Sequence, residues 1–178
     1  SFASLFLAYV IGVIGGVVLA SIRGQLLEKV GITFTLMTRA APEFWVGMFL
    51  LAIFAFELRW LPSSGTSSPG TIYKSEFQKL TSKDFWEHMA LPTATLAFYL
   101  HGLPLLLMRS SMLEILDQDY ITMGRLIGYS RWRLMIRHAA RNALLPVLTA
   151  LTLGIGYSIG GNVVVENVFG WPGIGRLL

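Results

Sequence analysis

Residues with reactive side chains are few and scattered along this chain. There is no cysteine, and the three histidines do not combine with Asp or Glu at metal-ligand spacing. No Ser, His and Asp stand in an order typical of a nucleophile and its base, and no G-x-x-x-x-G-K-[ST] phosphate loop is present. We therefore expect no catalytic residue, no metal site and no cofactor bound by this chain itself, and we expect that it is not an enzyme.

Charged side chains concentrate instead in one connection, Arg109 to Arg141. Within it, Asp119 to Ile127 predicts a short helix, and Gly128 fits the position just past a helix end, where a left-handed backbone is common. Ser130 is a good N-cap for a second helix. That second helix would carry a basic row at i, i+4, i+8 spacing, made of Arg133, Arg137 and Arg141.

Two interpretations of this connection remain open from the residues alone. The basic row suits anionic lipid headgroups, at roughly 1 kcal/mol for each basic residue near the surface, and Gly128 is then only a turn. Alternatively, a short rigid helix beside a membrane offers a knob to a partner protein and passes movement into the span that follows it. The connection is neither low in complexity nor rich in proline.

The composition indicates what surrounds this connection. Of 178 residues, 54% are hydrophobic and 13% are charged, about half the charged fraction of a soluble domain. The net charge of +4 is typical of basic loops flanking membrane spans, so we expect lipid contact and no nucleic acid. Four apolar runs have about the 20 residues that a membrane helix needs: Ser1–Ile22, Pro42–Leu61, His88–Met108 and Asn142–Val165.

The sequence thus predicts an all-α, polytopic membrane helix bundle that forms one domain over residues 1–178. Residues 58–87 form an outer loop, in which Lys74 to Glu87 predicts an amphipathic helix at the interface. Residues 109–141 form the inner connection. Nine basic residues fall on this inner side, counted over 23–39 and 109–141, and five on the other, which places the nine in the cytoplasm. The apolar stretch Val30–Thr38 is too short to span, and we expect a packed or interfacial helix there.

Three further patterns are each compatible with two interpretations. His101 is a titratable group inside a span, and such groups are often functional; a neutral histidine hydrogen-bonded to a neighbouring helix is the simpler alternative. Two G-x-x-x-G patterns, Gly12–Gly16 and Gly156–Gly160, suit close helix packing, or arise by chance among 18 glycines.

The connection also resembles a known family. The run D-Q-D-Y-I-T-M-G-R-L-I-G-Y-S, followed by R-H-A-A-R-N-A-L-L-P-V-L-T, is similar to the cytoplasmic signature loop of ABC-importer permeases, in particular the dipeptide/oligopeptide (peptide/nickel) family. That family's pattern is E-A-A-x-x-x-G. Gly128 occupies the glycine position, while Thr122, Met123 and Gly124 stand at E-A-A and Ile127 replaces a commonly basic residue.

Other motifs in the same order strengthen the resemblance. F-W-V-G-M-F-L-L with E-L-R-W-L-P-S-S-G is similar to the family's third span and its exit, and H-M-A-L-P to the start of the next span. Residues Val164 to Leu178, V-V-E-N-V-F-G-W-P-G-I-G-R-L-L, resemble the re-entrant outer segment before the last span. On this comparison the chain holds the family's second to fifth spans and lacks its first and last.

The resemblance implies a permease subunit in the inner membrane of a prokaryote, importing peptides or similar small solutes. Its implied partners are a second homologous permease subunit, two cytoplasmic ATPase subunits that carry ATP and Mg, an outer substrate-binding protein and membrane lipid. An ion-gradient-driven secondary transporter and a non-transporting scaffold are the alternatives. The implied ATPase-coupling residues are Asp119, Tyr120, Thr122, Met123, Gly124, Arg125 and Gly128. The expected outer gate contains Glu166, Phe169, Trp171, Pro172 and Gly173.

Overall fold

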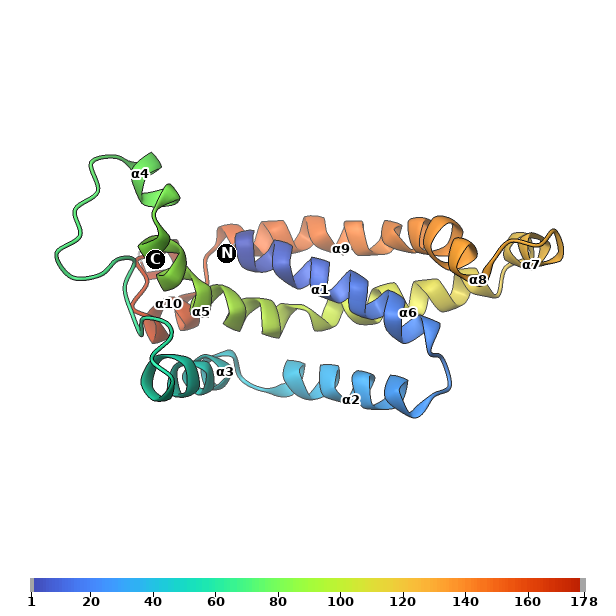
Figure 1. The fold of residues 1–178 in the computed structure, drawn as a ribbon, viewed down its shortest axis with the longest axis horizontal. Helices are drawn as coiled ribbons and strands as arrows, with labels where there is room; N and C mark the ends of the chain where they lie inside the picture. The colour runs from blue at the N-terminus through green and yellow to red at the C-terminus, as the bar shows by residue number, and fades with distance from the viewer. Residues whose placement is uncertain (1, 177–178) are drawn as a thin grey trace.

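Three long helices packed side by side form the centre of the molecule. The computed structural model describes residues 2–176, and within that range all regular structure is helical. Helices α1 (Phe2–Ser21), α6 (Gly102–Leu116) and α9 (Arg141–Ile159) run along one another (Figure 1). Their shared core is apolar and fully buried, and includes Leu5, Met108, Met112, Ala143 and Val147. The predicted all-α helix bundle is confirmed.

Helix α5 (Lys83–Leu100) continues into α6 through a single turn residue, His101. Together they form a 34-residue segment that is apolar enough to cross a membrane. Pro104 lacks the N–H that would bond the Leu100 carbonyl, which explains a break at this position. His101 is buried, and its Nδ1 lies 2.6 Å from the Phe98 carbonyl oxygen. The histidine is thus hydrogen-bonded within its own segment rather than to a neighbouring helix.

The second crossing is not the predicted helix over Pro42–Leu61. Helix α2 (Leu26–Ala40) runs beside α1 and α6, and α3 (Glu43–Leu50) with the π-helical η1 (Leu51–Glu57) then turns away by 102° (Figure 1). Only when the two halves are taken together are they long and apolar enough for one membrane span. Pro42 forces the residue before it out of the helical region, and Ala41 is extended at φ −70° and ψ 134°. The stretch predicted as a short packed helix therefore belongs to the crossing itself.

This bend also moves Arg39 out of the inner connection. Arg39 lies in the last turn of α2, with its side chain against Gly102 at the start of α6. Counting it with residues 23–39 as cytoplasmic was therefore wrong. Eight basic residues remain on the inner side against five on the outer side, so the asymmetry still favours the same orientation.

Two other predicted boundaries also shift. The predicted span Asn142–Val165 ends at Ile159, because the chain turns at Gly160 and at Gly161, whose φ is +75°. Helix α10 (Val163–Val168) then follows as a separate element. The predicted amphipathic helix is also two elements, α4 (Glu76–Thr81) and the first turns of α5. Ser82 separates them, and its Oγ accepts a hydrogen bond from the Phe85 N–H as the N-cap of α5.

The first G-x-x-x-G pattern is a packing seam between α1 and α6. A Cβ added at Gly12 would lie 2.9 Å from the His101 carbonyl oxygen, and one added at Gly16 would lie 2.7 Å from that of Leu105. The two backbones therefore approach too closely for any larger residue. Around Gly156 of the second pattern the described part of the chain leaves open space. Only the first pattern packs helices within this chain.

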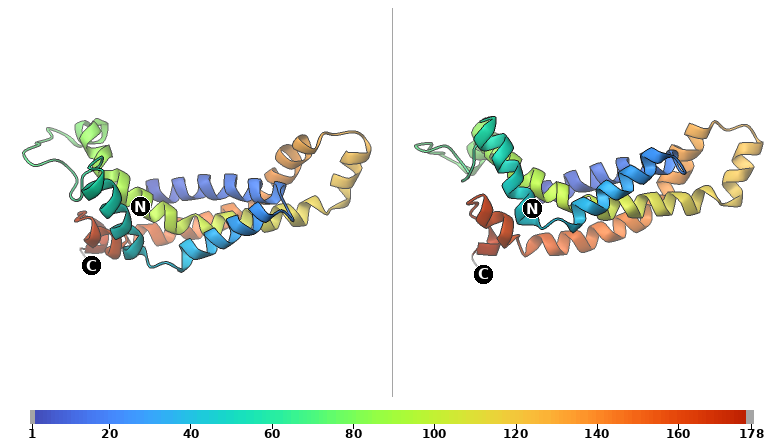
Figure 2. Two further views of the ribbon diagram at one scale, coloured as in Figure 1. Left: turned by 60° about the horizontal axis from the view of Figure 1, so that its bottom comes forward. Right: turned by 90° about the horizontal axis from the view of Figure 1, so that it is seen from below.

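The elements at the two ends of the bundle differ in kind. At one end project α7 (Asp119–Leu126) and α8 (Arg131–Arg133), and at the other lie α3, α4, α10 and η3 (Ile174–Arg176) (Figure 2). Among residues 2–176, three helices are long and apolar enough to span a membrane, and there are four such spans if the bent pair counts as one. The structure thus separates the connection that carries α7 and α8 from a cluster of short elements at the opposite end of the bundle.

Candidate functional site

The projecting helix α7 presents an apolar surface to solvent. Ile121 and Gly124 are buried on its inner side, where a Cβ on Gly124 would lie 2.7 Å from Leu134 Cδ2. The outer side carries large apolar side chains, and Leu126 is 79% exposed. The others are Tyr120, Met123 and Ile127. An exposed apolar cluster at the tip of a connection is typical of a docking surface.

The corner after α7 is fixed by its backbone. Gly128 has φ +90°, its N–H bonds the Arg125 carbonyl at 3.1 Å, and the Tyr129 N–H bonds the Gly124 carbonyl at 3.0 Å. This pair of bonds is the Schellman motif, which places a glycine at the first residue past the helix. Ser130 then caps α8, accepting a hydrogen bond from the Arg133 N–H. The backbone angle and these hydrogen bonds confirm both the predicted corner at Gly128 and the predicted N-cap at Ser130.

Arginines tie this corner to the ends of two spanning helices. Arg131 donates to the Ser21 carbonyl at the end of α1, and Arg125 donates to the Leu116 carbonyl at the end of α6 at 3.4 Å. Both bonds satisfy carbonyls that a helix end leaves open. Arg23 and Asp117 form a further, exposed ion pair at 3.4 Å. This role of Arg131 was not predicted from the sequence, although basic residues are the expected partners of helix C-termini.

The predicted basic row lies on a helix that runs into the membrane-spanning region. From Arg131 the chain is helical through the π-helical η2 (Leu134–Ala140) to the end of α9. Arg133, Arg137 and Arg141 are all exposed, and the Arg133 guanidinium lies 5.3 Å from the ring centre of Tyr129. The three arginines therefore point away from the bundle, at the level where the connection joins it.

At the opposite end, α10 and the segment after it close over α3 and α5. Phe169 is buried and contacts Gly47 of α3, while Trp171 packs against Phe85 with ring centres 5.8 Å apart. The Gly65 N–H bonds the Phe169 carbonyl at 3.0 Å and fixes the outer loop to this segment. The segment that resembles a re-entrant outer element is thus formed by the short helix α10, a turn and the short helix η3. Its last residues, 177–178, lie outside the described residues.

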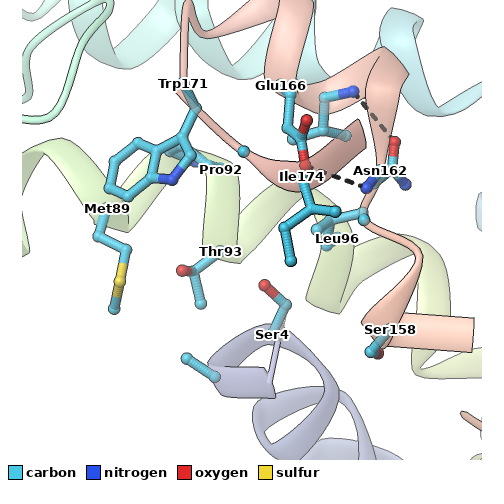
Figure 3. Close-up of a pocket in the computed structure, with 14 residues that line it drawn as sticks. Ser4, Met89, Pro92, Thr93, Leu96, Ser158, Asn162, Glu166, Trp171 and Ile174 are labelled. Carbon is cyan, nitrogen blue, oxygen red and sulfur yellow. Dashed lines mark hydrogen bonds between the residues drawn. The ribbon is translucent and has the colours of Figure 1, made fainter. Parts of the chain in front are cut away.

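Glu166 is the charged centre of this outer segment. Its side chain is buried, and its Oε1 accepts the Asn162 backbone N–H at 3.3 Å (Figure 3). A Cβ at Gly173 would overlap the Glu166 carboxylate, so only glycine lets the backbone at position 173 lie this close to Glu166. Of the predicted gate residues, the structure brings together Glu166, Phe169, Trp171 and Gly173, whereas Pro172 is exposed on the outside.

Two neighbouring cavities open beside this segment. The outer one is drawn in Figure 3 and lies between α1, α5 and α10, with Ser4, Thr93, Ser158 and Trp171 on its walls. The second, of about 500 Å³, extends from Asn162 toward the middle of the bundle between α1, α2–α3, α5–α6 and α9. Its polar lining was not predicted, and comes from Tyr9, Arg39, Glu43, Tyr99 and Tyr157. One signal existed in the sequence, an arginine and a glutamate four residues apart between apolar runs.

Neither site has the make-up of a reaction centre. Among the residues described, no three His, Asp or Glu side chains gather where they could hold a metal ion. The arrangement instead consists of a cavity in a helix bundle, a folded segment over its outer end, and a rigid projecting helix at the other end. Those parts suit passage of a solute and contact with other proteins.

Comparison with known proteins agrees with this arrangement. The chain is 33% identical over 175 residues to the glutathione transport system permease protein GsiC of Shigella flexneri, an alignment of 98% of this chain and 52% of that protein. It is 36% identical over 176 residues to a putative peptide permease protein of Brucella suis, covering 99% of this chain and 53% of the relative. The chain thus spans about half the length of these curated relatives. The family described as "binding-protein-dependent transport system inner membrane component" matches residues 12–178, and the chain belongs to that family.

Proposed function

We propose that this chain is the membrane-spanning core of a permease subunit in an ATP-driven importer of peptides or similar small solutes. It would form part of the translocation path and couple it to cytoplasmic ATPase subunits, which would carry the ATP and Mg. A second homologous permease subunit and an outer binding protein would complete the complex in a prokaryotic inner membrane. The names of the relatives, a glutathione permease and a peptide permease, support this cargo class.

The observation that carries this proposal is the projecting helix α7. A transporter driven by an ion gradient needs no apolar knob outside the membrane, whereas Met123, Leu126 and Ile127 are exposed there on a rigid corner. An ATPase surface that buries these side chains would gain roughly 25 cal/mol for each Å² of apolar area removed from water. Asp119, Tyr120, Thr122 and Arg125 surround the tip and would contact the same partner.

The test of this proposal is ATP-dependent uptake by the reconstituted complex. The full-length chain is purified from its native membrane, the copurifying proteins are identified, and uptake is measured in proteoliposomes with an outer binding protein present. We expect two ATPase subunits, a second permease and uptake that requires ATP. Uptake that follows an ion gradient without ATP would identify a secondary transporter, and partners without any uptake would identify a scaffold.

Orientation in the membrane gives an independent prediction. Residues 1–178 contain no cysteine, so a cysteine introduced at Ser130 is the only thiol in this part of the chain. Ser130 lies in the α7–α8 corner, so Ser130→Cys should react with an impermeant maleimide only in inside-out or permeabilised vesicles. Thr71→Cys in the outer loop is the matched control and should react in intact cells. Labelling of Ser130→Cys from outside would reverse the proposed orientation.

The folded segment over the outer cavity is the proposed outer gate. Trp171 and Phe169 anchor it, and Glu166 holds its turn against Asn162. Replacing Gly170 to Gly175 with a flexible polar linker removes the Trp171–Phe85 contact, and we expect ATP hydrolysis that no longer depends on the loaded binding protein. The measurement is ATPase activity with and without that protein. Wild-type dependence in the linker variant would show that the segment is an ordinary loop.

A further inference from the structure

Arg39 places a positive charge against the side of the apolar bundle, on a side chain that the described chain leaves exposed. Gly12, in the middle of α1, lies against His101 and Pro104, and the stem of Arg39 lies against the adjacent Gly102. Arg39 therefore stands level with the middle of α1, far from the basic residues at the α7 end. An ionised side chain at this depth in a membrane protein is costly and requires a compensating partner or function.

The described part of the chain provides no such partner. Arg109 pairs with Glu28, with Nε 2.8 Å from Oε1, and Arg23 pairs with Asp117. No hydrogen bond or ion pair to Arg39 occurs among residues 2–176. Its side chain instead borders the cavity of about 500 Å³, which is within the size range of small-molecule sites.

The same cavity contains a negative group at another part of its wall. Glu43 follows Arg39 across the bend at Pro42, and its Oε2 accepts a hydrogen bond from Asn162 Nδ2 at 2.7 Å. Glu43 and Arg39 form no ion pair with one another. Separated opposite charges in one cavity match the ends of a zwitterion better than they match a neutral solute. Broken helices at mid-membrane are also a recurring setting for solute sites.

We propose that Arg39 binds the carboxylate of a zwitterionic cargo, such as a short peptide, in this cavity, and that Glu43 faces its ammonium group. A guanidinium is suited to this role because its planar donors bind a carboxylate at two points. Tyr9, Tyr99 and Tyr157 line the same cavity, and their rings and hydroxyl groups suit contact with the backbone of peptides that differ in their side chains. The inference rests on the proposed permease function and adds to it a recognition site within the membrane.

A labelling experiment tests this site without the outer binding protein. Ser158 is half-buried on the cavity wall, and Ser158→Cys introduces the only thiol within residues 1–178, so labelling is measured on the peptide that contains residue 158. In the purified full-length complex, millimolar trialanine should slow maleimide labelling of this thiol severalfold, and trialanine amide should not. Equal protection by acid and amide, or none by either, overturns the inference, and this comparison needs no change at Arg39.

Variants at Arg39 then identify the residue responsible. In the Ser158→Cys background, Arg39→Gln should abolish protection by trialanine, whereas Arg39→Lys should keep part of it because the charge remains. Lys83→Gln, which removes a highly exposed outer charge, is the matched control. In this variant trialanine should protect the thiol at position 158 as well as it does in the Ser158→Cys parent. Protection by trialanine that persists in Arg39→Gln would exclude Arg39 as the carboxylate ligand.

Uptake separates failure of this site from failure of the proposed function. In proteoliposomes with saturating binding protein, Arg39→Gln should lower initial trialanine uptake about tenfold, which corresponds to about 1.4 kcal/mol. No ATP-dependent uptake by the wild-type complex would refute the permease proposal, while the labelling result would still decide the site. Normal uptake in Arg39→Gln refutes the site alone. Loss of the second permease from the Arg39→Gln complex would instead assign Arg39 to the subunit interface, and so would also refute it.

Discussion

Gly128→Pro should uncouple the permease from its ATPase while the spans still insert. The Gly128 backbone is at φ +90°, and proline is restricted to about −65°. Proline also removes the N–H that bonds the Arg125 carbonyl. The Schellman corner would have to refold and turn α7 away from its docking direction. We expect stimulation of ATP hydrolysis by the loaded binding protein to fall by at least about tenfold, equivalent to about 1.4 kcal/mol of coupling.

Two comparisons make this result specific to the corner. Gly128→Asn should lose little, because asparagine tolerates the left-handed region better than other residues with a side chain. Gly70→Pro is the matched control, since Gly70 has φ +86° and equally open surroundings but lies in the outer loop. Stimulation is measured in proteoliposomes, with copurification of the ATPase. Wild-type stimulation in Gly128→Pro would refute the coupling role of α7.

Gly16→Val should destabilise the whole bundle. Even a Cβ at this position would lie 2.6 Å from Met108 Cβ, 2.7 Å from the Leu105 carbonyl oxygen and 3.0 Å from the Arg109 nitrogen. Two of these atoms belong to the α6 backbone, which cannot move aside without separating the two helices. Overpacking of a filled core costs about 1–3 kcal/mol, and clashes with backbone fall at the upper end of that range. We expect a lower unfolding temperature and less folded protein in the membrane.

The matched control for this variant is the second glycine pattern. Gly156 is also inside a spanning helix, but nothing described lies within 4 Å of a Cβ added there. Gly156→Val should therefore unfold at nearly the wild-type temperature when the purified chain is heated in detergent. Gly16→Ala should be intermediate between wild type and Gly16→Val. Equal stability of Gly16→Val and Gly156→Val would mean that the α1–α6 seam is not a close contact in solution.

How far the sequence predicts this structure depends on whether local chemistry determines each element. The α7 helix, the Gly128 corner and the Ser130 cap were predictable, because capping residues act within a few positions of themselves. The second crossing was misplaced because hydropathy counts apolar residues and does not register a change in the direction of the helix axis. Only the extended backbone at Ala41 before Pro42 shows that the chain turns there.

The cavity could not have been predicted from any one segment. Its polar wall comes from four parts of the chain that are far apart in sequence, including Tyr9, Arg39 and Tyr157. The sequence indicates that these side chains lie in or beside membrane spans, but it does not indicate which of them face one another. The two G-x-x-x-G patterns illustrate the same limit, because identical spacing packs tightly at Gly16 and faces open space at Gly156.

The hydrogen bonds from the corner to two helix ends have a mechanical consequence. Arg131 holds the end of α1 and Arg125 holds the end of α6, and the glycine seam joins these helices along their length. A load applied at the tip of α7 is therefore shared by both helices, which respond as a single strut. Helix α2 is joined to this strut near its start by the Arg109–Glu28 ion pair, whereas among the described residues no hydrogen bond or ion pair joins α3, beyond the bend at Pro42, to α1 or α6. Displacement at the tip of α7 would thus be absorbed where the strut meets the bent pair, which is the wall of the cavity that contains Arg39 and Glu43.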